Sequence, residues 1–561
     1  MRRGVWLTVG LLVTGLGCSA DFDSPGSAGE DWGNQAGEGE WDEGDWNQNQ
    51  DSNQAGANQD FEPEEEEFLV RQTASTDSHV FVPNQADESE TVALIDGRDF
   101  SVRPIRVGRE PSVVVAAEVE DQGSVGYVLS TGAATVAIIR ADFHHAEQGY
   151  DVRLVPVPQE VNQLAVSPDG RHLLAYIDPD LPINTAASAV SLQSMALVRL
   201  GEEPGLDEVF QLSVTRMIDD VAFTADGSQA FVVGQEGIHR LMLEDIKADA
   251  FLPALNLGLS ASVFPPVDRE VAFSEDGSVL VVRTSQYAGV GLFELDPEGS
   301  QVLTQTLVEL AGVPTDIDLV ERDGEAPLLV ASLRQEEQVV LIDLEEALAS
   351  EGEGQDYMRV LEAPGVATGI GRLTPDGEQM ILFSTLPLVP VVGLLDLETE
   401  EITTFEMRNQ VRNLAVSPDS RTAVVVHRRQ EAPQGAGGDW DEQFRNSEGI
   451  TIWDLNTGYR RPVLLQAEPE EIIMTTDDTG HPYLYVMLTS SNPNFQGVKR
   501  VDLLTHRTDF VRLPRPPTGL GQVGDRVFVN QDQSTGRITF FEIRTNEQRT
   551  VSGFELNAGI Q

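Results

Sequence analysis

The stretch LAVSPDGRHLLAYI, residues 164–177, holds two short apolar runs separated by Asp169-Gly170. The same pattern returns four times: VAFTADGSQAFVV from Val221, VAFSEDGSVLVV from Val271, LTPDGEQMILF from Leu373 and LAVSPDSRTAVVV from Leu414. Asp-Gly is a favoured dipeptide for the tight turn of a β-hairpin. Hairpins of this kind that recur at intervals of about 50 residues predict a β-propeller or a related array of strands.

Each repeat continues beyond its hairpin. A third apolar run follows, such as GITIWDL from Gly449, and several units add a fourth, as in DLETEEITTFEM from Asp396. Nine such units have inner strands that begin near Val113, Leu164, Val221, Val271, Ile317, Ile370, Leu414, Ile472 and Leu520. A partial unit precedes them from Ser78. We therefore predict an all-β propeller of four-stranded blades over residues 78–561, with eight to ten blades rather than seven. The partial unit could also complete the last blade as a closing clasp.

These repeats resemble the bacterial YVTN and WD40-like propeller repeats. The resemblance rests on TVALIDGRDF from Thr91, LAVSPDGR from Leu164 and GITIWDLNTG from Gly449, and it extends loosely over most of residues 78–545. The Gly-His pair of eukaryotic WD repeats is absent, and Trp453-Asp454 is the only Trp-Asp pair in a third strand. The resemblance therefore implies an architecture and leaves the function open.

The first 18 residues predict an exported lipoprotein. Arg2 and Arg3 precede an apolar run, and Leu16-Gly17-Cys18 resembles a lipobox, although the Leu usually found three residues before the cut is replaced by Gly15. Cys18 is the only cysteine of the chain. We expect lipid on Cys18 and a place in a bacterial outer membrane, facing the periplasm or the cell surface, because Ser19 is not the Asp that retains lipoproteins in the inner membrane. The alternative is an ordinary cleaved signal peptide whose cysteine is incidental.

Residues 19–77 predict a disordered acidic tether. Residues 21–67 contain sixteen Asp and Glu and no Lys or Arg, so this segment repels itself and cannot bury a core. Trp32, Trp41 and Trp46 lie within it and could form a short docking or calcium-binding motif, but a plain solvated tether explains them as well. The whole chain has a net charge of −55. Since such a surface repels phosphate backbones, we do not expect nucleic acid as a partner.

The loops predict where binding occurs. The Asp-Gly turns are short and uniform, whereas the loops between second and third strands vary, with long ones at residues 178–191, 428–448 and 489–496. Loop 428–448 carries Trp440 and Phe444 among Asp439 and Asp441. It is either a contact surface or an acidic disordered insertion. We expect its shortening to change stability by less than about 1 kcal/mol, since loop-closure entropy varies slowly with length.

A second candidate site lies where the inner strands begin, seven residues before each turn aspartate. A propeller would gather the residues at this position around the mouth of its channel. They are Asn162, Asp219, Arg269, Asp316 and Arg412. Such a ring of mixed charge could bind a small polar ligand or a peptide. Alternatively, these side chains only bond the backbone of a neighbouring blade.

Signals for catalysis are weak. The chain has no phosphate-binding loop, no G-x-S-x-G and no H-E-x-x-H. His144 and His145 are adjacent and would point to opposite faces of a strand, and Asp478-Thr479-Gly480 stands where other units have their turn. We predict no cofactor and no metal. The favoured function is a lipid-anchored binding or scaffold module for a protein, peptide or glycan. The alternative is a lactonase-like hydrolase, which should gather His, Asp and Glu with shifted pKa values in the channel.

Overall fold

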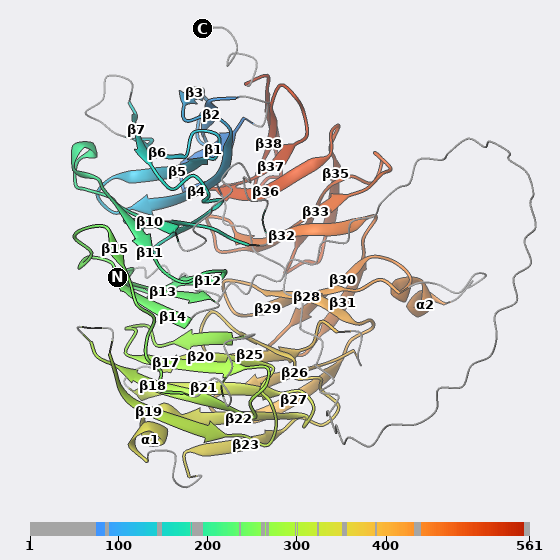
Figure 1. Cartoon of the computed structure of the whole chain (residues 1–561). Helices are drawn as coiled ribbons and strands as arrows, with labels where there is room; N and C mark the ends of the chain where they lie inside the picture. The colour runs from blue at the N-terminus through green and yellow to red at the C-terminus, as the bar shows by residue number, and fades with distance from the viewer. Residues whose placement is uncertain are drawn as a thin grey trace, which may run out of the picture.

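The computed structural model confirms the propeller. It describes residues 74–84, 89–142, 149–179, 181, 194–234, 237–259, 264, 269–297, 299, 301–322, 325–350, 356–386, 390–430 and 439–554. These residues form ten sheets that follow one another around a ring (Figure 1). Cys18 and the predicted tether up to residue 73 lie outside the described part of the chain, as do His144 and His145.

Strands occupy four positions in a blade, counted from the centre of the ring. Nine inner strands line the centre: β4 (Pro111–Val119), β8 (Gln163–Val166), β12 (Ile218–Phe223), β16 (Arg269–Phe273), β20 (Asp316–Arg322), β24 (Ile370–Leu373), β28 (Val411–Val416), β32 (Glu468–Thr476) and β36 (Pro517–Val523). The second strands are β1 (His79–Pro83), β5 (Gly123–Ser130), β9 (His172–Tyr176), β13 (Gln229–Gly234), β17 (Val279–Thr284), β21 (Glu325–Leu333), β25 (Gln379–Phe383), β29 (Thr422–His427), β33 (Pro482–Thr489) and β37 (Arg526–Gln531).

The outer half of each blade repeats in the same way. The third strands are β2 (Thr91–Asp96), β6 (Thr135–Arg140), β10 (Ser194–Arg199), β14 (Gly237–Met242), β18 (Gly289–Leu295), β22 (Gln338–Asp343), β26 (Val391–Asp396), β30 (Gly449–Asp454), β34 (Gly497–Asp502) and β38 (Arg537–Glu542). The fourth strands are β3 (Val102–Arg106), β7 (Asp151–Pro156), β11 (Glu208–Ser213), β19 (Val302–Glu309), β23 (Met358–Glu362), β27 (Glu401–Glu406), β31 (Arg460–Leu464), β35 (Thr508–Arg512) and β39 (Gln548–Ser552). In the remaining blade the chain crosses over instead, and β15 (Ala250–Phe251) pairs in parallel with β11 of the preceding blade.

Alternating side chains join neighbouring blades. In β9, Leu173 and Ala175 pack toward the preceding blade, while Leu174 packs toward the following one. This follows from the two-residue period of a strand, which sends successive side chains to opposite faces. Ten hydrophobic clusters result, each built from two consecutive sheets. The tenth packs Val80 and Ile95 of the first blade against Phe528 and Phe540 of the last, so the ring is closed.

The first unit forms its own blade, so the closing-clasp alternative is wrong. Strands β1, β2 and β3 make a separate sheet, while the last blade has four strands of its own. Ser75 stands at the inner position of the first blade through an isolated bridge to Val80. The Ser75 hydroxyl also donates a hydrogen bond to the carbonyl of Gln522 in the last blade, at 2.8 Å. Among the described residues, the ring thus includes Ser75, which precedes the predicted boundary at Ser78.

The repeated Asp-Gly turn has a folding role. Thr224 donates its hydroxyl to Asp226 at 2.7 Å and accepts the Gln229 amide at 3.1 Å, while Asp226 accepts the Ser228 amide at 3.0 Å. The same three bonds recur in the turns at Asp169, Asp276, Asp376 and Asp419. Since the side chains satisfy the backbone of the turn, folding alone explains their uniformity.

Helices are few and short among the described residues. They are η1 (Pro204–Leu206), α1 (Leu344–Ala349) and α2 (Trp440–Arg445). The described part of the chain holds no helix with the length and apolar character needed to cross a membrane. Asp478-Thr479-Gly480 forms a turn, as predicted: Asp477 accepts the Thr479 amide at 2.9 Å, and Gly480 has a φ of +81°.

Candidate functional site

The ring has two faces with different loops. We call the face that carries the second-to-third loops and the blade connections the variable-loop face. The opposite face, with the Asp-Gly turns and the third-to-fourth turns, is the turn face. Alternating strand directions place these loops on opposite ends of every blade. Both candidate sites predicted from the sequence lie on the variable-loop face.

Helix α2 holds the predicted aromatic residues on the variable-loop face. Trp440 is 43% exposed and stacks on Phe444, with ring centroids 5.3 Å apart and an interplanar angle of 20°. The Arg408 guanidinium lies 5.1 Å from the centroid of the Trp440 ring and forms an ion pair with Asp441. Asp439 caps the helix by accepting the Glu442 amide at 3.0 Å. The structure therefore brings together all four residues predicted from this loop, and Trp440 offers the exposed ring.

Phe444 anchors this helix in the blade. Its side chain is fully buried and meets the ring of His427 edge-on, at 5.3 Å. A Cβ added to Gly449 would come within 2.7 Å of the Phe444 ring, which shows how closely the helix packs on β30. Loop 428–448 was expected to tolerate shortening. That expectation is wrong for residues 440–445, because deleting them would empty a buried aromatic site. Residues 431–438 lie outside the described chain.

Polar contacts fix the two ends of this loop. Asn409 is 1% exposed and donates to the carbonyls of Arg428 and Arg445, at 2.8 and 3.1 Å. Gln430 donates to the Asn409 side-chain oxygen at 2.9 Å. These bonds close the base of the loop onto the connection that carries Arg408. Trp440 therefore lies on a helix whose two flanking segments are fixed to the blade by hydrogen bonds.

Of the other two variable loops, loop 489–496 is described in full and loop 178–191 only in part. In loop 489–496 Phe495 is an exposed aromatic side chain, and Arg512 donates to Asn494 at 3.0 Å. It lies on the blade that follows the one bearing Trp440. Of loop 178–191, only Asp178, Pro179 and Leu181 fall within the described residues. Their nearest predicted site residue is Asn162, which donates to the Asp178 carbonyl at 2.9 Å.

The predicted channel-mouth residues divide into separate pairs. Asn162 is buried and bonds its own blade, because it also accepts the Asp178 amide at 2.7 Å. Arg412 pairs with Glu468 of the next blade at 2.8 Å. Burial lowers the pKa of Arg269, and the nearby Asp219 carboxylate offsets part of that effect. The Nε and Nη1 atoms of Arg269 are buried without a hydrogen-bond partner.

Asp316 forms a buried carboxyl pair with Glu270 of the preceding blade. Burial and the adjacent Glu270 carboxylate raise the pKa of Asp316 well above its usual value. Asp316 accepts the Gly371 amide at 2.6 Å, and Glu270 accepts the Ile317 amide at 3.4 Å and pairs with Arg283. Each acid therefore bonds the inner strand of the following blade, whose edge amides would otherwise lack partners. This matches the backbone-bonding alternative for Asp316.

Two further acidic side chains on inner strands also accept hydrogen bonds from backbone amides. Glu471 accepts the Leu520 amide of the next blade at 2.6 Å, which repeats the Asp316 arrangement. Asp220 accepts its neighbour's amide at Val221, at 2.8 Å, and burial raises its pKa to about 7. Within the described residues, no group of three His, Cys, Asp or Glu side chains is arranged to hold a metal ion.

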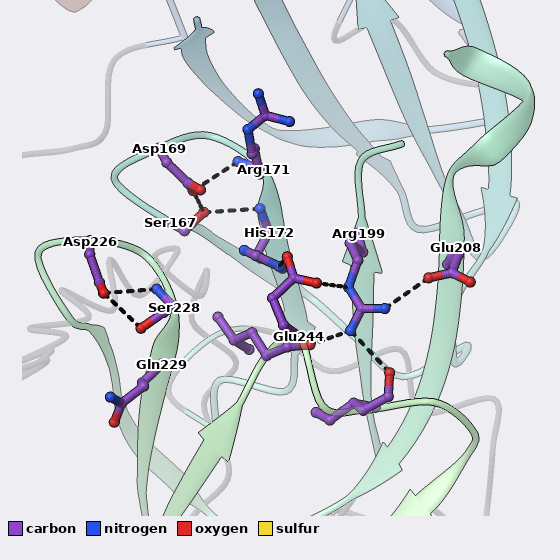
Figure 2. A network of polar contacts seen from close by, with 12 residues as sticks. Ser167, Asp169, Arg171, His172, Arg199, Glu208, Asp226, Ser228, Gln229 and Glu244 are labelled. Carbon is purple, nitrogen blue, oxygen red and sulfur yellow. Dashed lines mark hydrogen bonds and ion pairs between the residues drawn. The ribbon is translucent and has the colours of Figure 1, made fainter. Parts of the chain in front are cut away.

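The sequence analysis did not predict that arginines on the turn face donate hydrogen bonds to the neighbouring blade. We call such a contact an arginine latch. In Figure 2, Arg199 at the end of β10 reaches the next blade and donates to the carbonyls of Leu243 and Ile246, the latter at 3.0 Å. Glu208 lies 2.8 Å from Nη1 of Arg199, and Glu244 lies 3.6 Å from its Nε. The only sign in the sequence was an arginine near the end of an apolar third strand. The carbonyls that it binds lie more than forty residues further along the chain, so the local pattern does not reveal the contact.

Comparison with known proteins adds little beyond the fold. No protein-family model matches the chain, and no curated protein sequence is similar to it. Among solved structures, the chain resembles a eukaryotic initiation factor with 12% identity over 78% of this chain and 97% of that one, at a TM-score of 0.46. It also resembles dihydro-heme d1 dehydrogenase NirN in complex with DHE, with 10% identity, coverage of 88% and 79%, and a TM-score of 0.38.

A third resemblance is to a putative 6-phosphogluconolactonase from Bacteroides fragilis, with 12% identity, coverage of 71% of this chain and 93% of that one, and a TM-score of 0.31. All three matches have a TM-score below 0.5 and an identity of 12% or less. Likeness at this level carries no information on ligand or activity.

Proposed function

We propose that the chain is a lipid-anchored module of the bacterial cell envelope that binds a protein, peptide or glycan on its variable-loop face. The observation that carries the proposal is the exposed ring of Trp440 on helix α2, where it contacts both Arg408 and Phe444. Folding accounts for Phe444, which fills the core. It does not account for an indole left 43% exposed beside an arginine.

The chemistry of this group suits contact. Trp and Arg are the side chains most enriched at binding hot spots, because they combine large apolar area with hydrogen-bond donors. Rigid anchoring adds to this, since a preorganised side chain loses little conformational entropy when a partner covers it. Asp441, paired with Arg408, supplies a hydrogen-bond acceptor next to the ring.

To test this, the parent protein, W440A and Y459A are each immobilised and exposed to solubilised cell envelopes. The molecules that each of the three captures are then compared. Tyr459 is 56% exposed and lies in the third-to-fourth turn of the same blade, on the turn face, so it is a matched exposed aromatic. We expect W440A to lose the specifically captured partner and Y459A to retain it. Equal capture by both variants and the parent protein contradicts a role for the variable-loop face at Trp440.

The anchor rests on the sequence around Cys18, outside the described residues. We expect Cys18→Ser to move the protein from the membrane fraction to the soluble fraction after export. A variant that stays in the membrane fraction with normal processing contradicts lipidation. The expected site is the outer membrane, which density separation of the two membranes tests.

A lactonase-like hydrolase is the second candidate. The raised pKa values of Asp220, at about 7, and of Asp316 favour it, since a carboxyl group poised near neutrality suits general acid–base catalysis. Against it, Asp316 and Glu270 already bond the backbone of the following blade. Lactone hydrolysis by the parent protein that D316N abolishes, with its fold retained, would establish the hydrolase instead.

A further inference from the structure

A cavity opens on the turn face between the last two blades. Its volume is about 540 Å³, which lies within the range of small-molecule sites. The third and fourth strands of the ninth blade form one wall, and the turn after β38 of the tenth blade forms the other. Its lining residues are Tyr483, Arg500, Asp502, Arg507, Asp509, Phe510, Val511, Arg544, Thr545 and Asn546.

This cavity is positively charged in a chain of net charge −55. Its lining holds three arginines and two aspartates, a formal charge of +1 before Asp478, which pairs loosely with Arg544, is counted. One of the two aspartates is already engaged, because Asp502 accepts from His481 at 2.9 Å and from the amides of Leu504 and Thr505 at 3.0 and 2.8 Å. The Oδ1 of Asp502 is therefore occupied, and the arginines of the lining are the groups left to bind an anion.

Arg500 is buried with part of its hydrogen-bonding capacity unused. The residue is 9% exposed and donates through Nη2 to the carbonyl of Ile543 at 2.6 Å. Its guanidinium lies 4.1 Å from the ring centroid of Tyr483. Its Nε has no hydrogen-bond partner, and Nη1 is 3.8 Å from the nearest oxygen of Asp509. A buried donor without a partner is destabilising, so an acceptor placed there would be favoured.

The outer arginines of the cavity form only loose ion pairs. Arg507 lies 3.6 Å from Asp509, and Arg544 lies 3.6 Å from Asp478. A charge-assisted hydrogen bond between guanidinium and carboxylate is about 2.7–2.9 Å long. Both side chains are more than half exposed. They can therefore turn toward an anion at little cost.

Figure 2 shows a similar arginine contact between two other blades, in which a carboxylate lies beside the guanidinium. Arg199 and Arg500 make the same kind of contact from positions two residues apart in the third strand, and each faces an acid across the third and fourth strands, Glu208 or Asp509. Each also donates to the carbonyl that follows the third strand of the next blade, that of Leu243 or Ile543.

The next residue along the chain differs in charge. After Leu243 comes Glu244, whose carboxylate faces the Nε of Arg199 at 3.6 Å. After Ile543 comes Arg544, so this place holds a positive charge instead of a carboxylate, although Nε lacks a hydrogen-bond partner in both arginines. One blade pair thus supplies the carboxylate from its own chain. The other pair has the same arginine latch, an added positive charge and an open cavity.

We propose that this cavity binds the carboxylate of a small polar organic acid, at the place that Glu244 fills beside Arg199. Arg500 and Arg544 hold the carboxylate, while Phe510 and the polar Thr545 and Asn546 contact the body of the molecule. Asn546 adds an acceptor, because its Oδ1 is buried without a partner. A planar guanidinium fork matches a carboxylate, and a net charge of +1 matches a monoanion better than a doubly charged phosphate.

This site is independent of Trp440, since it lies on the opposite face. Titration calorimetry on the parent protein with glucuronate, acetate, glucose and inorganic phosphate tests the ligand class. We expect saturable binding of glucuronate, weaker binding of acetate, none of glucose, and phosphate at least about tenfold weaker than glucuronate. Binding of glucose equal to glucuronate, or phosphate as tight as glucuronate, overturns the proposal, as does the absence of any carboxylate binding.

R544E tests the site itself. The variant places a carboxylate at the position equivalent to Glu244, so this carboxylate should fill the place of the ligand and weaken glucuronate binding at least tenfold. Its midpoint of unfolding should be equal to or above that of the parent, which separates occupation from misfolding. R515E makes the same change of charge at an exposed residue away from the cavity and should bind as the parent does. Parent-like binding by R544E overturns the assignment of the site.

Discussion

Nη1 of Arg526 donates a hydrogen bond to the carbonyl of Gly97 at 2.8 Å, which joins the last blade to the first across 429 positions of sequence. The same guanidinium lies 5.1 Å from the ring centroid of Phe100. Phe100 in turn packs edge-on against Phe540, with centroids 5.0 Å apart. The ring is therefore closed by side chains that cross the gap, without a strand shared between the two ends of the chain.

R526A should weaken this closure. A hydrogen bond from a charged donor contributes about 1.5–3 kcal/mol, and partial exposure of the Arg526 side chain reduces that figure, so we expect a loss of about 2 kcal/mol in the free energy of unfolding. Urea unfolding followed by circular dichroism measures it. R515A removes an exposed arginine as a control and should change stability by less than about 0.5 kcal/mol. Equal midpoints for the two variants contradict the closing role of Arg526.

Two turn glycines should differ in their tolerance of alanine. Gly377 and Gly170 both have positive φ, +73° and +72°, so alanine costs about 1–2 kcal/mol at either position through backbone strain. An added Cβ meets nothing within 4 Å at Gly377, but at Gly170 it comes within 2.8 Å of Ala117 and 2.9 Å of Val119. We therefore expect G170A to lower the unfolding midpoint clearly more than G377A does. Similar losses would show that β4 yields to the added methyl group.

The fold could be predicted from the sequence because its period is local. Strand length, alternation and the Asp-Gly turn all lie within a few residues. Each inner strand contains the residue at which the sequence placed its start, from Val113 in β4 to Leu520 in β36, and begins at that residue or up to four residues before it. The sequence predicted the number of blades only as a range, from eight to ten. Whether the unit from Ser78 stands alone depends on its contacts with residues such as Gln522, which the local pattern does not contain.

The candidate sites depended more on distant contacts. Asn162 and Asp316 share a sequence position but differ in the structure, where one bonds its own blade and the other bonds the next. The role of Phe444 was also missed, because a loop rich in Gly and Asp gives no local sign that one ring within it reaches the core. The latch of Arg199 was missed for the same reason, since its partners lie on another blade.

Replacing Asp220 by asparagine should change the pH dependence of stability. Burial raises its pKa from 3.8 to about 7, so between these values the folded chain keeps a proton that the unfolded chain has released. The free energy of unfolding then falls as the pH rises through this window, by at most about 1.4 kcal/mol per pH unit. D220N cannot titrate and should gain stability relative to the parent from pH 4 to pH 7. Asn retains an oxygen to accept the Val221 amide.

The measurement is urea unfolding at a series of pH values for the parent, D220N and D245N. Asp245 is exposed on the turn face, so D245N removes the same charge without a buried carboxyl group. We expect the difference in stability between D220N and D245N to grow as the pH rises from 4 to 7. A difference that stays constant would show that Asp220 is solvated in the folded protein.

Trp440 and Phe444 should separate binding from stability. Phe444 is fully buried, and Phe→Ala at a buried site costs about 3–5 kcal/mol, so F444A should lower the free energy of unfolding by about 3 kcal/mol or more. Trp440 is 43% exposed and contributes chiefly its stacking on Phe444, worth about 1 kcal/mol. W440A should therefore stay folded with a loss of about 1 kcal/mol.

Comparison of W440A with F444A then separates two roles of α2, contact with a partner and stabilisation of the blade. W440A should lose the captured partner while its urea midpoint stays near that of the parent. F444L keeps an apolar side chain in the buried site and should bind the partner better than F444A, since it preserves the position of the helix below Trp440. If W440A instead unfolds as readily as F444A, the indole belongs to the core of the blade, and its exposure does not mark a contact surface. The variable-loop face would then have to bind through Phe495 or through the pairs around Arg269 and Arg412.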